Sequence, residues 1–220
     1  MIFYTFDDLS IEKEAAIKNS DSTHKGKWCD AWEVDRLNGE SEKCPLCGRH
    51  VSMLRWLEPC KIRLSNTKYP DRITAWLTEP MVVSERVKDA YQQNGLTGIL
   101  KFIPVEIVKV AYMKENSPKP PKYFYADIPY TTNIKVYPDE TVIVGQKNGW
   151  TCTLCNPWGT TIDEVKYLSL NTTEWKGEDV FKIYSLGATF VSKNFFDLVN
   201  EYYFSNFNLV RAEEYTNNHK

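Results

Sequence analysis

Apolar residues recur at helical spacing in two places along the chain, each time after an apolar stretch. The first set follows "AWLTEPMVV" (75–83) and the second follows "VFKIYSLGATFV" (180–191). A serine, Ser84 or Ser192, stands in each case where a helix N-cap is expected. We therefore predict two strand-helix units, whose helices carry these apolar positions: Val87, Ala90 and Tyr91 in the first, and Phe195, Leu198, Val199 and Tyr202 in the second.

The segments that follow each helix predict further strands. Gly95 can end the first helix in a left-handed conformation, and "GILKFIPVEIV" is then predicted as a returning strand. Tyr203 takes the place of Gly95 in the second unit, so we expect the second helix to continue toward Asn206. Alternation in residues 122–130 and 132–144 predicts a hairpin leading to the second cysteine pair. The opening "MIFYTFDD" resembles "KYFYADIP", which suggests that the same strand begins each half.

A constant offset of 108 residues, here called the repeat offset, relates the two helical segments to each other and the two cysteine pairs to each other. It joins Cys44 to Cys152 and Cys47 to Cys155, and it places residues 82–107 on residues 190–215 without a gap. We infer a tandem duplication; the alternative is two ordinary strand-helix-strand units that align by chance. The predicted fold is α+β, with two pseudo-symmetric strand-helix-strand repeats in one compact unit. Residues 1–112 form the first repeat, 113–123 a Pro-rich connector and 124–220 the second repeat.

Composition and charge limit the classes of protein that fit. With 220 residues, 42% of them hydrophobic, the chain can bury a sizeable core. Lys+Arg number 27 and Asp+Glu 29, so no overall charge favours nucleic acid or an anionic membrane. The N-terminus has acidic residues where a secretory signal is basic, and no segment approaches the roughly 20 apolar residues of a membrane span. We expect a cytoplasmic protein, where paired cysteines favour metal binding over disulfides.

Four of the six cysteines lie in C-x-x-C pairs. Two residues between thiolates let a tight turn direct both sulfurs at one cation, and Pro45 and Gly48 suit such a turn. One pair supplies two ligands, whereas a closed tetrahedral zinc site needs four. We predict one structural zinc ion, shared by the two repeats and held by Cys44, Cys47, Cys152 and Cys155. Reactive redox pairs, disulfides and turns without a metal are the alternatives.

The remaining cysteines and histidines offer little further chemistry. His50 could replace a metal ligand, although a surface histidine is the commoner outcome, and we expect Cys29 and Cys60 to be packing residues. The chain has no nucleophile elbow, phosphate-binding loop, dinucleotide fingerprint or H-E-x-x-H motif. A four-thiolate zinc leaves no open coordination position, so we predict that the protein is not an enzyme. The basic clusters around Arg63 and in "SPKPPK" are short, which makes nucleic-acid binding a weaker hypothesis.

Two cysteine knuckles, each followed by "VSER" or "VSKN", an amphipathic helix and a closing apolar strand, resemble the bacterial double-CxxCG motif family over roughly residues 40–215. "CPLCG" matches that motif fully, whereas "CTLCN" has Asn156 in place of glycine. The resemblance implies an immunity protein that binds and neutralises a cognate toxin without an active site. Such a protein needs a charge-complementary surface, for which "RAEEY" and "NTTEWKGED" are candidates. The alternatives are a zinc-ribbon nucleic-acid-binding or regulatory protein and an uncharacterised hydrolase.

Overall fold

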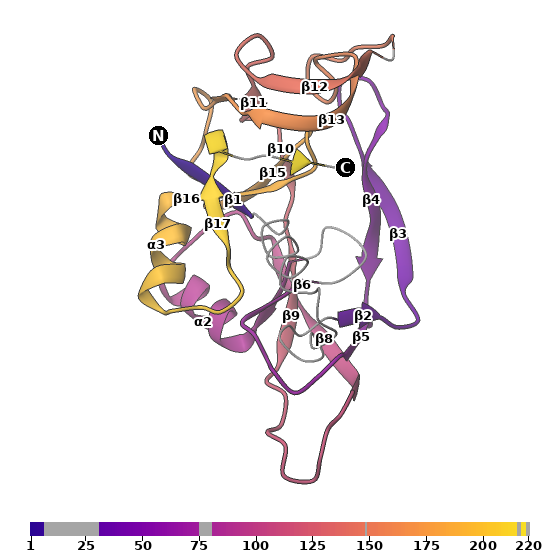
Figure 1. Ribbon diagram of the computed structural model, residues 1–220, viewed down its shortest axis with the longest axis vertical. Helices are drawn as coiled ribbons and strands as arrows, with labels where there is room; N and C mark the ends of the chain where they lie inside the picture. Colours follow the sequence, from indigo (N-terminus) through magenta and orange to yellow (C-terminus); the bar gives the residue numbers. More distant parts are fainter. Residues whose placement is uncertain (7–30, 75–80, 148, 215–216, 219–220) are drawn as a thin grey trace, which may run out of the picture.

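The computed structural model describes residues 1–6, 31–74, 81–147, 149–214 and 217–218 (Figure 1). In these residues the fold is α+β and mostly β, with two α-helices. Neither helix is long and apolar enough to cross a membrane. The helical elements are α2 (Glu85–Gln93), α3 (Lys193–Glu201) and the 3-10 turn η2 (Ala212–Glu214). The strands are β1 (Phe3–Phe6), β2 (Ala31–Glu33), β3 (Leu37–Lys43), β4 (His50–Leu57), β5 (Cys60–Leu64), β6 (Arg72–Thr74), β7 (Met81–Ser84), β8 (Lys101–Val110), β9 (Tyr123–Asp127), β10 (Tyr130–Thr131), β11 (Lys135–Val136), β12 (Val142–Lys147), β13 (Thr160–Tyr167), β14 (Leu170–Asn171), β15 (Val180–Ile183), β16 (Thr189–Ser192), β17 (Leu209–Arg211) and β18 (Asn217–Asn218).

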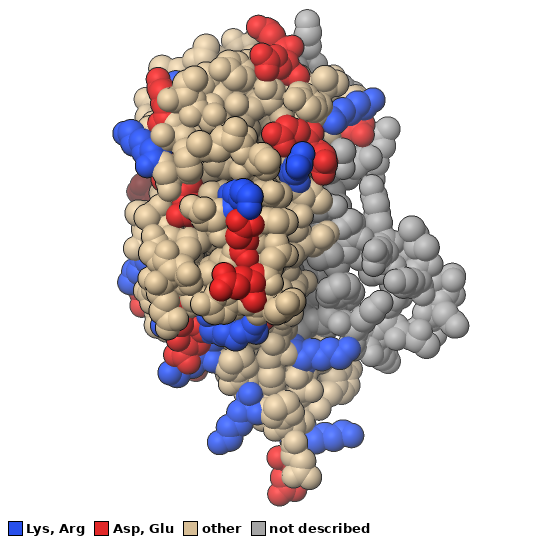
Figure 2. Space-filling view, turned by 90° about the vertical axis from the view of Figure 1, so that its left-hand side faces the viewer, with Lys and Arg blue, Asp and Glu red and all other residues tan. Residues whose placement is uncertain are grey.

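Two larger sheets form the body of the described structure. Their strand orders are β10-β15-β16-β1-β17 and β2-β5-β8-β9-β7-β6. The smaller sheets are β3-β4, β11-β14 and β12-β13-β18. The long β3-β4 hairpin runs along one side of the body toward the end where β12 and β13 lie, and α2 and α3 lie side by side on the opposite side (Figure 1). Seen from the helix side, acidic and basic side chains are intermixed over the body (Figure 2).

The two predicted strand-helix units have matching boundaries. Helices α2 and α3 are each nine residues long, and their first residues, Glu85 and Lys193, are related by the repeat offset. The hydroxyl of Ser84 accepts the N–H of Val87, and the hydroxyl of Ser192 accepts that of Phe195. Both serines are therefore N-caps, as the sequence predicts. The buried faces of the helices meet in one core, where the rings of Tyr91 and Phe195 lie 6.3 Å apart.

The prediction that the second helix continues toward Asn206 is wrong. Helix α3 ends at Glu201, and Tyr203 adopts a left-handed φ of 52°, as Gly95 does with 66°. The N–H of Phe204 then donates to the carbonyl of Val199 at 3.0 Å, which closes a Schellman motif. A left-handed conformation costs a tyrosine about 1–2 kcal/mol. Burial of the Phe204 ring, which is 6% exposed, offsets that cost.

Two strand predictions also need correction. The predicted hairpin between 122–130 and 132–144 does not form, because β9 pairs with β7 and β8, while β11 pairs with β14 and β12 with β13. Strand β9 is mostly buried along its length, which suits a central position in a sheet. Residues 180–191 form two strands, β15 and β16, instead of one. Of "AWLTEPMVV", residues 75–80 lie outside the described residues.

The likeness between "MIFYTFDD" and "KYFYADIP" corresponds to equivalent strand positions. Strand β1 pairs with β16, where Tyr4 lies opposite Val191, and β9 pairs with β7, where Phe124 lies opposite Val83. The closing strands pair next to them: Ile103 of β8 with Tyr125, and Val210 of β17 with Thr5. By these registers Ile103 and Val210 occupy equivalent positions in their sheets. The repeat offset would instead place Ile103 on Arg211, one position further along. The gapless alignment is therefore wrong by one position in the closing strand.

Residues 111–122, which include most of the predicted connector, form a loop between β8 and β9 that projects from one end of the molecule (Figure 1). Strands β8 and β9 are neighbours in the six-stranded sheet, whereas β10 lies in the five-stranded sheet. The chain therefore passes from one sheet to the other between Asp127 and Tyr130. Strand β1 at the N-terminus lies in the sheet of the C-terminal unit.

Two buried aspartates join the sheets through the loops that follow the helices. Asp71 Oδ2 accepts hydrogen bonds from the backbone N–H and the hydroxyl of Ser205, at 2.9 and 3.1 Å. Asp179 Oδ2 accepts the corresponding bonds from Thr97, at 2.9 and 3.4 Å. The repeat offset relates Asp71 to Asp179 and Thr97 to Ser205. Each aspartate thus binds the loop that belongs to the other strand-helix unit, an arrangement we call the aspartate exchange.

Candidate metal centre

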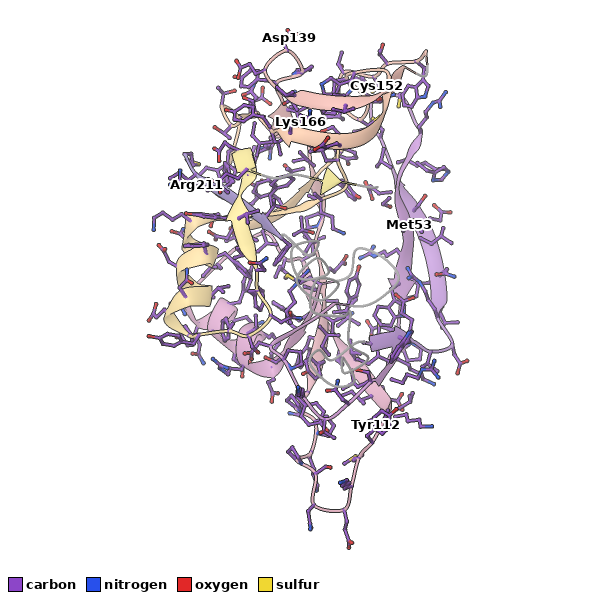
Figure 3. The ribbon with its side chains drawn as sticks, viewed as in Figure 1. Met53, Tyr112, Asp139, Cys152, Lys166 and Arg211 are labelled. Carbon is purple, nitrogen blue, oxygen red and sulfur yellow. The ribbon has the colours of Figure 1, made fainter. Side chains whose placement is uncertain are left out.

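The four cysteines of the two C-x-x-C pairs come together at the tips of two hairpins. Cys44 and Cys47 lie in the turn between β3 and β4, and Cys152 and Cys155 lie between β12 and β13 (Figure 3). The four Sγ atoms lie within 4.8 Å of one another. The sulfurs of Cys44 and Cys152 are 3.8 Å apart, and those of Cys47 and Cys155 are 3.5 Å apart. The predicted juxtaposition of the two pairs is confirmed.

This spacing matches a tetrahedral thiolate site. A tetrahedron with metal–sulfur bonds of about 2.3 Å has sulfur–sulfur edges of about 3.8 Å. A disulfide would bring two sulfurs to about 2.0 Å, and all four cysteines are free in the structure. The cluster could therefore hold a metal ion such as zinc.

The two cysteine turns, residues 44–48 and 152–156, share the hydrogen bond that closes the turn and differ in the bond made by the N–H of their first cysteine. Gly48 N–H donates to Cys44 O at 2.8 Å, and Asn156 N–H donates to Cys152 O at 3.0 Å. Cys44 N–H then donates to Arg49 O, whereas Cys152 N–H donates to Asn156 O, one position earlier. The side-chain amide of Asn156 also donates to the carbonyl of Trp150 at 3.0 Å. The asparagine therefore gives a tighter turn that still directs both sulfurs at the cluster.

Local hydrogen bonds favour the thiolate of Cys152 over that of Cys155. Burial raises the pKa of Cys152, but the backbone N–H groups of Cys155 and Leu154 and the thiols of Cys155 and Cys47 lower it to about 6. Burial and hydrogen bonds to the neighbouring thiols raise the pKa of Cys155. Negative charge in the cluster thus opposes the deprotonation of Cys155. A bound cation reverses this balance, because thiols lose their protons when they coordinate a metal.

Packing around the cluster ties the two hairpins to the body. The guanidinium of Arg49 lies 3.9 Å above the ring of Trp150 on the other hairpin. The hydroxyl of Tyr184, just after β15, donates to Glu42 Oε1 of β3 at 3.3 Å. Burial and the Glu42 carboxylate raise the pKa of Tyr184 to about 12, which keeps this donor protonated. Cys44 and Cys152 are buried and Cys47 is exposed, so the cluster has one solvent-facing side.

The other sequence candidates take no part in the cluster. His50 is exposed on β4, and its Nδ1 forms a hydrogen bond with the hydroxyl of Ser41. Cys60 is 1% exposed in the core, and burial raises its pKa to about 11, so its prediction as a packing residue is confirmed. Cys29, His24 and His219 lie outside the described residues. Sequence reasoning missed Asp71 and Asp179, although the repeat offset relates them as it relates the cysteines.

A cavity of about 160 Å³ lies between β4, β9 and the start of β10. Its lining includes Arg36, Arg55, Asp127 and Lys182. Arg55 forms an ion pair with Asp127, and Arg36 pairs with Glu33. Both arginines of the lining thus have carboxylate partners within the described chain.

Comparisons with known proteins add no relative: no protein-family model matches the chain, and no curated protein matches it. The resemblance to the double-CxxCG motif family rests on the residues quoted for it.

Proposed function

We propose that the chain is a non-catalytic immunity protein that binds and neutralises a protein toxin in the cytoplasm, and that one structural zinc ion joins its two pseudo-symmetric repeats. The observation that carries the metal part of this proposal is the gathering of four free thiols from two hairpin tips. A site with four sulfur ligands is closed, so the zinc would stabilise the fold without meeting a substrate.

The repeat relationship supports the role of the metal as a joint. Both close sulfur pairs connect residues 108 positions apart, which is the repeat offset. The aspartate exchange joins residues of both units that are related by the same spacing, Asp71 to Asp179 and Thr97 to Ser205. A fold built by duplication brings equivalent turns together at its pseudo-symmetry axis, so each repeat supplies two of the four ligands.

The immunity role is supported by the resemblance to the double-CxxCG motif family. It is also compatible with the absence of a need for catalytic groups in a protein that acts by binding. A neutralising protein needs a stable scaffold and a specific surface, and it needs no catalytic group. The structural metal and the paired charges of the cavity are consistent with a scaffold.

The test uses the protein encoded by the gene adjoining that of this chain. The two proteins are co-expressed and purified, and the growth of cells that express the neighbour alone is compared with growth on co-expression. We expect a stable complex and restored growth, and a Cys44→Ser/Cys152→Ser variant should restore growth poorly. Unchanged toxicity in the presence of folded, zinc-loaded wild-type chain would falsify the proposed function.

A further inference from the structure

Two basic segments that are separate in the sequence lie together at one end of the molecule. Residues 61–69 and 106–122, here called the basic end, contain seven Lys and Arg residues and two Glu residues, in a chain of net charge −2. Strand β5 pairs with β8, which places Arg63 beside Lys109. The hydroxyl of Tyr69 donates to Pro118 O at 3.0 Å and ties the two segments together. The fold thus concentrates positive charge that neither segment carries alone.

Most of these cations have no acidic partner among the residues that the structure describes. Lys68, Lys109, Lys114 and Lys119 are exposed, and in the described part of the chain none of them forms an ion pair. Lys122 pairs with Glu85 at 3.0 Å. Like charges side by side on neighbouring strands, as at Arg63 and Lys109, reduce stability. An acidic surface placed against this end would remove that repulsion.

An exposed apolar pair lies within the basic end. Tyr112 is 79% exposed and Met113 is 48% exposed, at the point where β8 enters the projecting loop. Figure 2 shows Lys and Arg side chains on both sides of this projection. Aromatic residues and methionine are enriched at the centres of protein–protein interfaces, and charges around them set orientation and association rate.

The acidic groups of one segment considered from the sequence, "NTTEWKGED", have partners within the chain. Asp179 is 5% exposed and takes part in the aspartate exchange. Glu178 accepts hydrogen bonds from Asn133 and from the backbone of Lys176. Glu174 lies 3.9 Å from Lys135. The three acidic groups of "NTTEWKGED" therefore have partners, in contrast to most cations of the basic end.

We propose that the basic end is the surface that contacts the toxin, with Tyr112 and Met113 as the apolar centre and Lys109, Lys114 and Lys119 as the cations that recognise an acidic patch on the partner. This inference rests on the proposed function. The shape favours a protein over a nucleic acid, because the lysines surround a projecting loop. Nucleic-acid strands are bound in basic grooves with several stacking aromatics.

The experiment measures binding of the adjoining-gene protein by calorimetry at two salt concentrations. Lys114→Glu/Lys119→Glu is compared with Lys135→Glu/Lys166→Glu, which makes the same charge change at the opposite end, where Figure 3 labels Lys166. We expect the first variant to lose at least about tenfold in affinity and most of its salt dependence, and the second to stay within about twofold of wild type. Tyr112→Ala should lose about tenfold and keep the salt dependence. Zinc content should be unchanged in all variants. Melting temperature should be unchanged in the variants of the basic end, and Lys135→Glu, which lies beside Glu174, should lower it only slightly.

The failures of the two proposals are distinguishable. If wild type binds and both Lys114→Glu/Lys119→Glu and Tyr112→Ala bind equally well, the basic end is not the contact surface and the immunity role stands. If wild type does not bind the adjoining-gene protein, the proposed function fails, and this inference fails with it. If wild type binds a duplex DNA oligonucleotide more tightly than that protein, and only the lysine variant loses this binding, the partner is a nucleic acid and the inference is overturned.

Discussion

Besides their shared apolar core, the two repeats are joined by two polar contacts, the cysteine cluster and the aspartate exchange, and the chemistry of these two joints is opposite. At the hairpin tips four identical side chains converge within 4.8 Å, and the ligand set is complete only if all four are thiols. At the aspartate exchange Asp71 and Asp179 correspond, and so do Ser84 and Ser192, which donate to their Oδ1 atoms, but the other donors differ. Thr97 corresponds to Ser205, and the donor next to Asp71 is Arg86, whereas the donor next to Asp179 is Asn194.

The difference shows how each joint tolerates sequence change. A carboxylate can be satisfied by any well-placed donor, so hydroxyl, amide and guanidinium groups can replace one another. A tetrahedral zinc site loses a bond with each lost ligand, and its binding free energy contributes directly to folding. The metal joint should therefore be the stronger and the less tolerant of the two.

The largest effect is expected from loss of a buried thiol. Cys152→Ser removes one of four ligands, so the variant should retain far less zinc and melt at least about 10 °C lower, as measured by metal analysis and thermal unfolding. Cys60→Ser is the matched control, because Cys60 is buried at least as fully as Cys152 and lies outside the cluster. It should retain full zinc with a smaller loss of stability. Equal zinc content in Cys152→Ser and wild type contradicts the shared site.

The next largest effect is expected at the loop of the aspartate exchange. Gly98 has a φ of 107°, and a Cβ there would lie 2.0 Å from the carbonyl oxygen of Val180. Gly98→Ala should cost about 3 kcal/mol in the free energy of unfolding, measured by urea denaturation. Gly95 also has a positive φ but has open space around it, so Gly95→Ala should cost about 1 kcal/mol. If the two glycine variants are equally stable, the close approach of the units is wrong.

A smaller contrast is expected between the two aspartates. Asp71 accepts from Arg86, at 3.0 Å, as well as from Ser205, whereas Asp179 has only neutral donors among the hydrogen bonds described above. Asp71→Asn should therefore be less stable than Asp179→Asn by about 0.5–1 kcal/mol, since the Arg86 side chain is half exposed and its pair is screened. Adding Arg86→Gln to both variants should abolish the difference in denaturation midpoints. A difference that persists would show that the arginine is not its cause.

The smallest effect is expected in the second knuckle. Asn156→Gly restores the residue of the first knuckle and removes the hydrogen bond to Trp150, so stability should fall by no more than about 1 kcal/mol. Zinc content, measured with a thiol-competing chelator, should stay at the wild-type level because both sulfurs remain in place. A large loss of zinc would mean that Asn156 positions the sulfurs.

The sequence was sufficient for features that depend on spacing or on local chemistry. The repeat offset predicted that Cys44 and Cys152 would meet, and the capping preference of serine predicted the starts of both helices. Prediction failed where contacts between distant segments of the chain determine the local conformation or the place of a strand in its sheet. Tyr203 accepts a left-handed conformation because Phe204 is buried by residues far along the chain, and β9 is central because β7 and β8 flank it. Asp71 and Asp179 had no motif, so only the fold revealed the aspartate exchange.

The most direct test of the account is the metal content and coordination of the purified chain. We predict one zinc ion per chain, with an X-ray absorption spectrum of four sulfur neighbours at about 2.3 Å. Well below one zinc per chain after growth in zinc-sufficient medium, or a coordination shell with nitrogen or oxygen ligands, would contradict a zinc ion held by Cys44, Cys47, Cys152 and Cys155.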